Sequence, residues 1–462
     1  MTIRTAAAVA AGKLARLGLQ ALGRGATALP GLVALAVDPR AIGEMAAHLP
    51  RGAVLVSGTN GKTTTSRMLA DIVRAAGWHP IHNRSGSNLD RGIAAALLAE
   101  ASWLGRPRGD VGVFEVDEAS VPRVLQQMTP RVVLVTNLFR DQLDRYYEID
   151  ALARRIAEAF AALPADVTVV LNADDPIVAR LGERHSGPIL TFGVDDPSVG
   201  GRVPQDISDA THCPRCNTPL AYARVVLAHV GDWSCPGCGL ARPPRDVSAT
   251  EVRLDRSGTL LRIAAPAAGA LDPVRVPVPG LYNAYNALAA IACARALDIG
   301  LPTAVRAIAA FRPAFGRLEV VGAGGRSLRL VLVKNPAGFN AAISALLETG
   351  GRHRLLAALN DRDADGRDVS WIWDADFEAL APAVEHAVVT GLRARDLALR
   401  FKYAGVERSR LHLVDGWSEA IRQAIERAPA GGEVVVVATY TAMLALRDAL
   451  ARLGYVRQFW ED

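Results

Sequence analysis

The stretch VLVSGTNGKTTTSRML, Val54 to Leu69, decides the fold class of the first large domain. An apolar run typical of a β-strand meets a glycine-rich turn, and the residues from Lys62 onward have the pattern of a helix. Backbone N–H groups at the start of a helix bind phosphate, and the helix dipole also favours an anion there. We therefore predict a phosphate-binding turn, called the glycine loop below, made of Gly58, Thr59, Asn60, Gly61, Lys62, Thr63 and Thr64.

The glycine loop is shorter than the common G-x-x-x-x-G-K-[ST] pattern, because Val56 stands where the first glycine of that pattern would fall. We expect Lys62 to neutralise the β- and γ-phosphates of ATP, and the hydroxyl of Thr63 to bind Mg²⁺. The chain uses arginine almost everywhere, and its only other lysines are Lys13, Lys334 and Lys402. A lysine in this loop therefore indicates phosphate chemistry, for which a compact ammonium is well suited.

Composition excludes several classes of protein. Half of the 462 residues are hydrophobic, the net charge is +5, and the basic residues are spread along the chain, which argues against a nucleic-acid-binding protein. No apolar run approaches the roughly 20 residues that a membrane span needs. Lys13 and Arg16 interrupt the alanine-rich N-terminus, so we expect an amphipathic helix there rather than a secretory signal. Four of the five cysteines form two C-x-x-C pairs, which indicate a metal site in a reducing compartment, and we therefore expect a cytoplasmic protein.

Alternating strand and helix patterns predict an α/β fold. Strand-like runs at 53–57, 111–116, 131–137 and 167–175 alternate with helical stretches, which is typical of a parallel, doubly wound sheet with ligands at the strand ends. We expect a helical segment at 1–50, an ATP-binding domain at 51–324 with an insert at 208–245, and a C-terminal α/β domain at 325–462.

Two groups of carboxylates follow strands of this expected sheet. FEVDEAS contains Glu115, Asp117 and Glu118, and TNLFRDQLD contains Asp141 and Asp144. Carboxylate oxygens suit Mg²⁺, which also keeps water and nucleotide phosphates as ligands. Each group by itself is better explained as a solvated strand end than as a metal site. Because the glycine loop lies in the same sheet, we predict that Glu115 joins Thr63 in binding Mg²⁺.

The insert contains four of the five cysteines, arranged as two C-x-x-C pairs with 18 residues between them. Such pairs form tight turns that hold one metal ion in a tetrahedral thiolate site. Since all four positions are filled by the protein, the site leaves no place for a substrate. We predict a structural Zn²⁺ at Cys213, Cys216, Cys235 and Cys238.

These motifs together carry a family resemblance. SGTNGKTTT, EVDE, TNLFRDQLD, GLYNAYNALAAIA and FGRLEVV resemble the ATPase domain of the Mur ligase superfamily. The cysteine insert, VKNPAGFN and LNDRDADGRDVSWIWD resemble more closely the MurT family, the synthetase subunits of lipid II isoglutaminyl synthase. The resemblance covers nearly the whole chain. It implies a ligase that uses ATP to convert a carboxylate into an acyl phosphate, which an amine then attacks.

The resemblance also implies roles for residues outside the glycine loop. Asn283 and Asn286 would lie near the adenine, although their pattern is equally consistent with a plain helix start, and Arg317 would reach the phosphates. Many Mur ligases have a histidine for a second Mg²⁺ where this chain has Gln142, which implies a one-metal or differently built site. About 50 residues precede the glycine loop, which fits a lipid-linked substrate better than a UDP-linked one.

The source of the nitrogen points to a partner. Glutamine hydrolysis needs a reactive cysteine, and the fifth cysteine, Cys293, lies in an apolar helix where we expect an inert thiol. The resemblance implies a glutamine amidotransferase subunit similar to GatD. It also implies that Asp368 supplies a carboxylate to the partner's Cys–His pair across the interface.

We therefore expect ATP-dependent amidation of the α-carboxylate of D-glutamate in the lipid II stem peptide, at the inner face of the cell membrane, as a step of peptidoglycan synthesis. Two alternatives remain open at this point. One is a ligase similar to folylpolyglutamate synthase, against which the cysteine insert argues. The other is a non-catalytic zinc-ribbon scaffold that binds a nucleotide.

Overall fold

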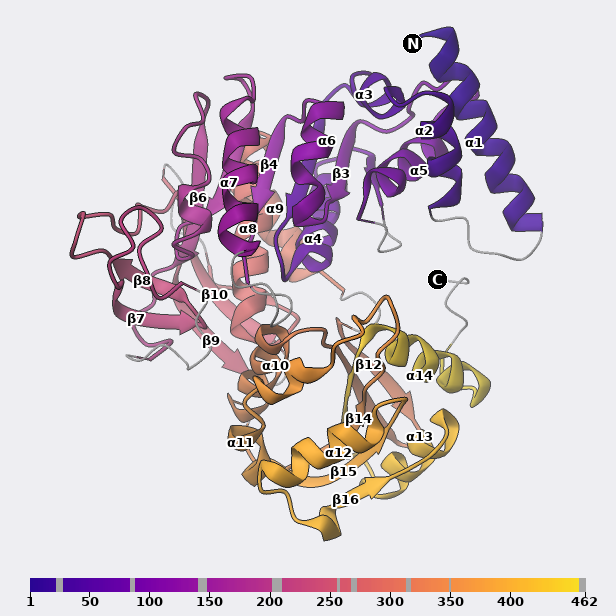
Figure 1. Cartoon of the computed structure of the whole chain (residues 1–462), viewed down its shortest axis with the longest axis vertical. Helices are drawn as coiled ribbons and strands as arrows, with labels where there is room; N and C mark the ends of the chain where they lie inside the picture. The colour runs from indigo at the N-terminus through magenta and orange to yellow at the C-terminus, as the bar shows by residue number, and fades with distance from the viewer. Residues whose placement is uncertain are drawn as a thin grey trace.

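The computed structural model of the chain consists of two α/β domains with a helical cap at the N-terminus (Figure 1). The structure describes residues 1–21, 28–83, 88–139, 148–201, 210–255, 258–266, 272–312, 317–348 and 350–456. The side chains at positions 148, 317, 318 and 348 lie outside this description. Asp141, Gln142 and Asp144, which the sequence analysis considered, also lie outside it.

The cap is formed by residues that were expected to be helical. It consists of α1 (Ile3–Ala21), α2 (Leu29–Val37) and α3 (Ala41–Ala46), and it packs on α5 (Asp90–Glu100). Helices α2 and α5 approach very closely at Gly31: a Cβ atom added there would lie only 1.8 Å from the carbonyl oxygen of Arg91. This contact therefore depends on a residue without a side chain.

The first domain is built on a nine-stranded sheet in the order β11-β10-β9-β6-β5-β4-β1-β3-β2. Its pairs are parallel from β2 to β9, and the pairs β9–β10 and β10–β11 at one edge are antiparallel. The strands are β1 (Ala53–Ser57), β2 (Pro80–His82), β3 (Val111–Glu115), β4 (Val132–Val135), β5 (Thr168–Asn172), β6 (Ile189–Val194), β9 (Val247–Asp255), β10 (Gly258–Ala264) and β11 (Val274–Val276).

Helices cover both faces of this sheet, because its central strands are apolar on both sides. Val54 and Val56 of β1 belong to the core with α4, α8 and α9, whereas Ala53 and Leu55 belong to the core with the cap, α5, α6 and α7. Alternate residues of one strand therefore build two separate cores. The additional helices are α4 (Lys62–Ala75), α6 (Val121–Gln127), α7 (Glu148–Ala161), α8 (Leu281–Ala296) and α9 (Leu301–Ala309).

The C-terminal domain has a six-stranded sheet in the order β12-β13-β17-β14-β15-β16, parallel except for the β12–β13 pair. Helices α10 to α12 pack on one face, and α13 and α14 pack on the other. The strands are β12 (Arg317–Ala323), β13 (Arg326–Leu332), β14 (His353–Ala358), β15 (Val384–Thr390), β16 (Leu411–Leu413) and β17 (Glu433–Ala438). The helices are α10 (Pro336–Glu348), α11 (Phe377–Leu380), α12 (Ala394–Tyr403), α13 (Trp417–Glu426) and α14 (Tyr440–Arg452).

The first strand of this second sheet lies earlier in the chain than expected. The sequence patterns predict a C-terminal domain that starts at residue 325, but β12 begins at Arg317 and pairs with β13. The pairing is a tight hairpin through Gly324 and Gly325, which both have positive φ. A short amphipathic strand followed by such a turn has no signal of its own that assigns it to the second sheet.

The insert forms a two-stranded antiparallel sheet of its own, β7 (Ala221–Leu227) and β8 (Val230–Ser234), between β6 and β9. It projects from the edge of the first domain that carries β9 and β10 (Figure 1). Among the described residues, none of the helices combines the length and apolar character that crossing a bilayer would require.

Candidate functional site

The glycine loop connects β1 to α4 at the carboxyl end of the first sheet. Gly58 and Gly61 have φ angles of +127° and +85°, which other residues rarely adopt. A Cβ atom at Gly58 would lie 2.2 Å from the hydroxyl of Thr136, and one at Gly61 would lie 2.1 Å from Oδ1 of Asn286. Both glycines are therefore required by the conformation and by the close approach of neighbouring elements.

The end of β4 holds the glycine loop in place. The Asn137 side chain accepts a hydrogen bond from the backbone N–H of Asn60 at 2.8 Å, and its backbone carbonyl accepts one from the N–H of Thr59 at 2.9 Å. Thr136 donates its hydroxyl to the carbonyl of Asn60 at 2.8 Å. These bonds fix the turn, so that α4 starts in a defined place and direction.

Lys62 is buried at the first turn of α4. Its ammonium donates to the carbonyl of Gly58 at 2.5 Å and to Oε2 of Glu118 at 2.9 Å. Burial lowers the pKa of Lys62, but the charge and hydrogen bond of Glu118, together with the charges of Glu115 and Asp117, outweigh burial and raise the net pKa. Burial likewise raises the pKa of Glu118, yet the charge and hydrogen bond of Lys62, with smaller effects of Lys334 and a backbone hydrogen bond, lower that pKa to about 2. Both groups are therefore charged at neutral pH.

Thr63 and Glu115, the two residues predicted to bind Mg²⁺, lie in direct contact. The Thr63 hydroxyl donates to Oε2 of Glu115 at 2.7 Å. Asn83 fixes the backbone of Glu115 from β2's end, accepting from its N–H at 2.8 Å and donating to its carbonyl at 2.9 Å. A hydroxyl and a carboxylate beside a phosphate-binding turn are oxygen ligands of the kind that Mg²⁺ prefers. The residues present therefore fit a magnesium ion.

A cavity of about 130 Å³ adjoins the glycine loop. The first domain contributes Asn283 and Asn286 from α8, and both side chains are buried. Asn286 donates to Oδ1 of Asn283 at 3.1 Å and accepts from the Thr65 hydroxyl at 3.3 Å, which ties α8 to α4. The C-terminal domain closes another side with residues of β13 and α10, namely Val331, Leu332, Ala337, Gly338, Ala341 and Ala342.

The tip of the insert hairpin forms a third wall of this cavity, with Leu227, Ala228 and Val230. The hairpin is anchored in the first domain by His229, whose ring packs 4.6 Å from that of Phe139. Trp233 adds a hydrogen bond from its indole N–H to the carbonyl of Ala173, at 3.1 Å. The sequence analysis predicted the insert but not this contact with the cavity.

Buried charges fasten the same hairpin. Asp174 is fully buried, with Arg242 at 3.1 Å, the Tyr285 hydroxyl at 2.8 Å and the N–H of Val194 at 2.7 Å. Burial raises the pKa of Asp174 to about 6, since it outweighs the opposing effect of Arg242. Arg242 follows the second cysteine pair, so this ion pair connects the insert to β5 and β6.

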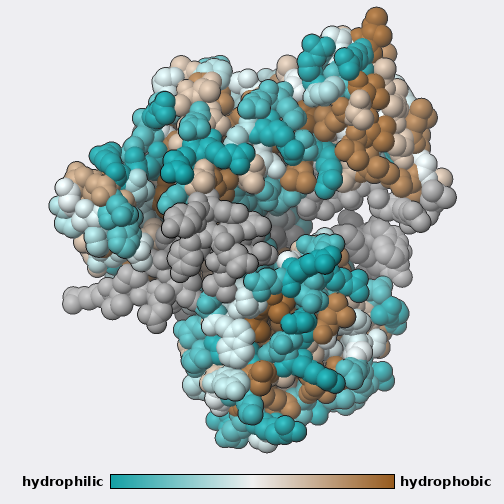
Figure 2. Space-filling view, in the orientation of Figure 1, coloured by the Kyte–Doolittle hydropathy of each residue, from teal (hydrophilic) through white to brown (hydrophobic). Residues whose placement is uncertain are grey.

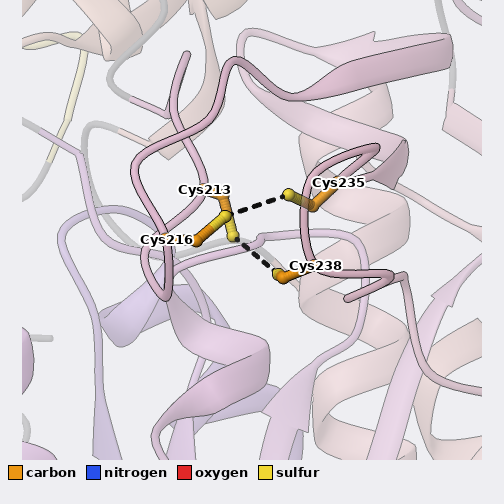
Figure 3. Close-up of side chains that lie close together, drawn as sticks. All are labelled: Cys213, Cys216, Cys235 and Cys238. Atoms are coloured by element: carbon orange, nitrogen blue, oxygen red, sulfur yellow. Dashed lines mark hydrogen bonds between the residues drawn. The ribbon is translucent and has the colours of Figure 1, made fainter.

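The four insert cysteines come together as predicted (Figure 3). The sulfur of Cys213 lies 3.6 Å from that of Cys238, and the sulfur of Cys216 lies 3.4 Å from that of Cys235. Four thiolates at about 2.3 Å from one ion would be separated by about 3.8 Å in a tetrahedron, which is close to these distances. The donor set and its spacing therefore fit a metal ion.

Comparisons with known proteins agree with this geometry. The Mur ligase middle domain matches residues 56–213, and the MurT ligase C-terminal domain matches residues 332–443. The chain is 35% identical to the lipid II isoglutaminyl synthase (glutamine-hydrolyzing) subunit MurT of Staphylococcus aureus (strain N315), over 86% of this chain and 87% of that protein. The chain belongs to the MurT family. The Streptococcus pneumoniae MurT subunit is 33% identical over 99% of both chains.

Solved structures place the MurT-family chain in the Mur ligase fold. MurF from Acinetobacter baumannii superposes with a TM-score of 0.67 at 20% identity, over 92% of this chain and 80% of that one. MurF from Thermotoga maritima, solved with ADP, gives 0.62 at 14% identity over 91% and 84%. The predicted fold class is thus confirmed. The folylpolyglutamate synthase of Mycobacterium tuberculosis shares this fold, with a TM-score of 0.59 at 16% identity over 98% of this chain and 96% of that one.

One cation of the site comes from the second domain. Lys334 lies between β13 and α10, and its charge lowers the pKa of Glu118 in addition to the larger effect of Lys62. The sequence gives Lys334 as one of four lysines and as part of VKNPAGFN, but assigns it no role. Its rarity in an arginine-rich chain was a signal that could have placed it with Lys62. The side chain of Arg317, expected at the phosphates, lies outside the described residues.

The acidic loop at 361–374 contains both buried and surface carboxylates. Asp365 is buried and accepts hydrogen bonds from the N–H of Thr441 at 2.7 Å and from its hydroxyl, so it holds the loop on α14. Asp368 lies at the surface, where it accepts from the N–H of Ser370 at 2.8 Å. Hydrogen bonds from Ser370 hold the pKa of Asp368 below its ordinary value. Asp368 is therefore an ionised carboxylate on an outer face.

The buried Lys62–Glu118 pair generates a stability prediction. We expect Glu118→Gln to lower the free energy of unfolding by about 3 kcal/mol at pH 7, because the Lys62 charge stays buried without its counter-charge. The contribution of Glu118 is complete above its unfolded pKa of 4.5 and is lost as the pH falls toward about 2. The difference between the two proteins should therefore shrink from pH 5 to pH 3, as measured by urea denaturation.

Glu100→Gln is the matched control, because Glu100 is half-exposed and its pairing with His79 spans 3.6 Å. We expect this change to alter the free energy of unfolding by less than about 0.5 kcal/mol. Equal effects of the two substitutions would contradict the importance of the buried pair.

Proposed function

We propose that this chain is the ATP-dependent synthetase subunit of a two-subunit amidotransferase of peptidoglycan synthesis. Its substrate is the α-carboxylate of D-glutamate in the lipid II stem peptide. A carboxylate oxygen takes the γ-phosphoryl group of ATP and ADP leaves. Ammonia then attacks the acyl carbon, phosphate leaves, and D-isoglutamine is formed. The observation that carries the proposal is the buried Lys62 between Gly58 and Glu118, in a loop that lies within the matched Mur ligase middle domain.

The residues of the glycine loop have separate roles in this proposal. The backbone N–H groups at the start of α4 would face the phosphates, whereas those of Thr59 and Asn60 donate to Asn137. The ammonium of Lys62 would neutralise the phosphate charge. Thr63 and Glu115 would hold Mg²⁺, which would supply further positive charge to the phosphates. Asn283 lies beside the cavity that adjoins the loop, where the adenine would bind, and Arg317 is assigned to the phosphates. A bound phosphate would compete with Glu118 for Lys62.

Ammonia must come from a second protein. Four cysteines are gathered in the insert, and Cys293 is fully buried in α8, where burial raises the pKa of its thiol. A buried protonated thiol cannot attack glutamine. We therefore assign glutamine hydrolysis to a partner amidotransferase subunit similar to GatD, docked on the C-terminal domain. The pair would work on the cytoplasmic side of the membrane, where its lipid-linked substrate is exposed.

The cysteine cluster is proposed to hold one structural Zn²⁺. We expect the purified protein to contain about one zinc per chain, and Cys213→Ser to lose it. Loss of the metal should also weaken nucleotide binding, because the hairpin that adjoins the cluster forms a wall of the cavity. Elemental analysis and titration with a fluorescent ATP analogue measure the two effects. Cys293→Ala is the control and should keep the zinc. The assignment would be contradicted if the purified wild type held no metal and were no more stable than Cys213→Ser.

The reaction is tested directly with lipid II. The chain, co-purified with its glutaminase, should convert lipid II to a product whose mass shows a hydroxyl replaced by an amino group, with one ADP per product. Lys62→Ala should lower this rate at least about 100-fold, because it removes the main charge at the transferring phosphoryl group. Unchanged turnover in that variant, or amidation without ADP formation, would refute the proposed chemistry.

Asp368 is proposed to orient the imidazole of the partner's Cys–His pair across the interface. Asp368→Asn should keep amidation from added ammonium but lower amidation from glutamine by about 100-fold or more, because only the partner's imidazole loses its carboxylate. Asp363→Asn is the control in the same loop, since Asp363 is exposed and pairs with Arg367. If Asp368→Asn uses glutamine and ammonium at the wild-type ratio, the role belongs elsewhere.

A further inference from the structure

Helix α1 is apolar on two opposite faces. Its inner face, with Thr5, Ala8, Val9 and Gly12, is buried against the rest of the cap and α5. The positions 3, 7, 10, 14 and 17 follow helical spacing along the outer face and are all apolar. The large side chains among them are open to solvent, with Ile3 exposed to 91%, Leu14 to 62% and Leu17 to 52%. Folding of the chain by itself therefore leaves this second face uncovered.

Neighbouring segments extend the outer face into a larger surface. After α5, Trp103 and Leu104 are exposed to 54% and 74%, and the Lys13 ammonium lies 5.7 Å from the centre of the Trp103 ring. Helix α2 adds two half-exposed leucines. Figure 2 shows apolar residues gathered over the corner of the molecule that carries α1 and α2. We call this surface the cap patch: Ile3, Leu14, Leu17, Leu29, Leu32, Trp103 and Leu104.

Basic side chains border the cap patch. Burial, and then the nearby positive charges of Arg16 and Arg108, lower the pKa of Lys13, while Glu100 has a smaller opposing effect. Arg106 is exposed and lies in the same turn as Trp103. A hydrogen bond from the N–H of Ser102 to the carbonyl of Arg106, at 2.8 Å, closes this turn. Arg4 is exposed on the other flank of α1. The surface thus combines large apolar groups with a positively charged border.

We propose that the cap patch docks on the surface of a bilayer that contains anionic phospholipid. A helix with an exposed apolar face and basic flanks lies in the plane of the membrane interface, and tryptophan is favoured at the same depth. Anionic headgroups complement the arginines and Lys13. Soluble proteins rarely expose so many large apolar side chains together without a binding partner.

The biological role of this docking rests on the proposed function, because the proposed substrate is lipid-linked and lies in the membrane. Docking through the cap would leave the C-terminal domain, at the other end of the molecule, free for the amidotransferase partner (Figure 1). Binding to lipid alone does not depend on the chemistry, so the two ideas can fail separately.

The test is flotation of the full chain with phosphatidylcholine vesicles that contain or lack phosphatidylglycerol, without substrate or nucleotide. We expect binding to the phosphatidylglycerol vesicles and weakening at high salt. The double variant Leu14→Glu/Leu17→Glu should lower the partition coefficient at least about tenfold. The control Leu392→Glu/Leu413→Glu changes two leucines exposed to 59% and 51% on the C-terminal domain, and should bind as the wild type does.

Other outcomes would overturn the proposal. No binding to anionic vesicles, or equal binding of the Leu14/Leu17 variant with an unchanged unfolding temperature, would exclude a lipid-docking role for the cap patch. Light scattering could instead show that the wild type is a dimer and the Leu14→Glu/Leu17→Glu variant a monomer. If neither protein binds vesicles, that result would assign the patch to contact with a second copy of the chain. Lys13→Gln/Arg16→Gln/Arg108→Gln leaves the apolar residues in place and should lose the preference for phosphatidylglycerol.

Amidation of a water-soluble muropeptide separates this proposal from the proposed function. The Leu14→Glu/Leu17→Glu variant should amidate that substrate at the wild-type rate and should be slower only with lipid II in vesicles. Wild-type protein that binds vesicles but amidates neither substrate would refute the proposed function and leave the docking surface intact.

Discussion

Two positions without a side chain, Gly58 and Gly61, determine how the centre of this molecule is assembled. Both glycines have positive φ angles, and neither has a Cβ atom. The end of β4 and the start of α8 can therefore contact the glycine loop directly, in space that a Cβ atom would occupy. Because the loop is fixed from both sides, Lys62 and Thr63 emerge at the first turn of α4 in defined directions. The pairing of Lys62 with Glu118 and of Thr63 with Glu115 follows from that placement.

The cavity beside the loop has walls from three parts of the chain that are distant in sequence. Helix α8 contributes polar amides, the C-terminal domain contributes small apolar residues from β13 and α10, and the insert contributes the tip of its hairpin. The insert is fastened by buried groups, among them Asp174 with Arg242 and His229 against Phe139. The four-cysteine cluster of the insert is therefore connected to the cavity through a short hairpin.

Much of the fold and of the candidate site could be predicted from local patterns. Apolar runs, glycines and following threonines indicated the loop and the parallel sheet, and the cysteine spacing indicated one four-sulfur cluster, which the structure brings together. Thr63 and Glu115 could be paired in advance because β1 and β3 are parallel and their carboxyl ends meet at one edge. The membership of β12 in the second sheet could not be predicted, because strand pairing across a domain boundary leaves no local signal in the sequence.

The sequence by itself determined the residue types of the site, since loop geometry, metal ligation and strand periodicity each depend on residues a few positions apart. Tertiary structure alone decided which of the neighbouring carboxylates Glu115, Asp117 and Glu118 faces Lys62, because a turn of η1 (Glu118–Ser120) directs that choice. It also decided that Lys334 comes near the same charges and that the insert reaches the cavity. Finally, it decided which face of α1 is buried, because close packing on α2 and α5 selects the face with the small residues Ala8 and Gly12 and leaves Leu14 and Leu17 exposed.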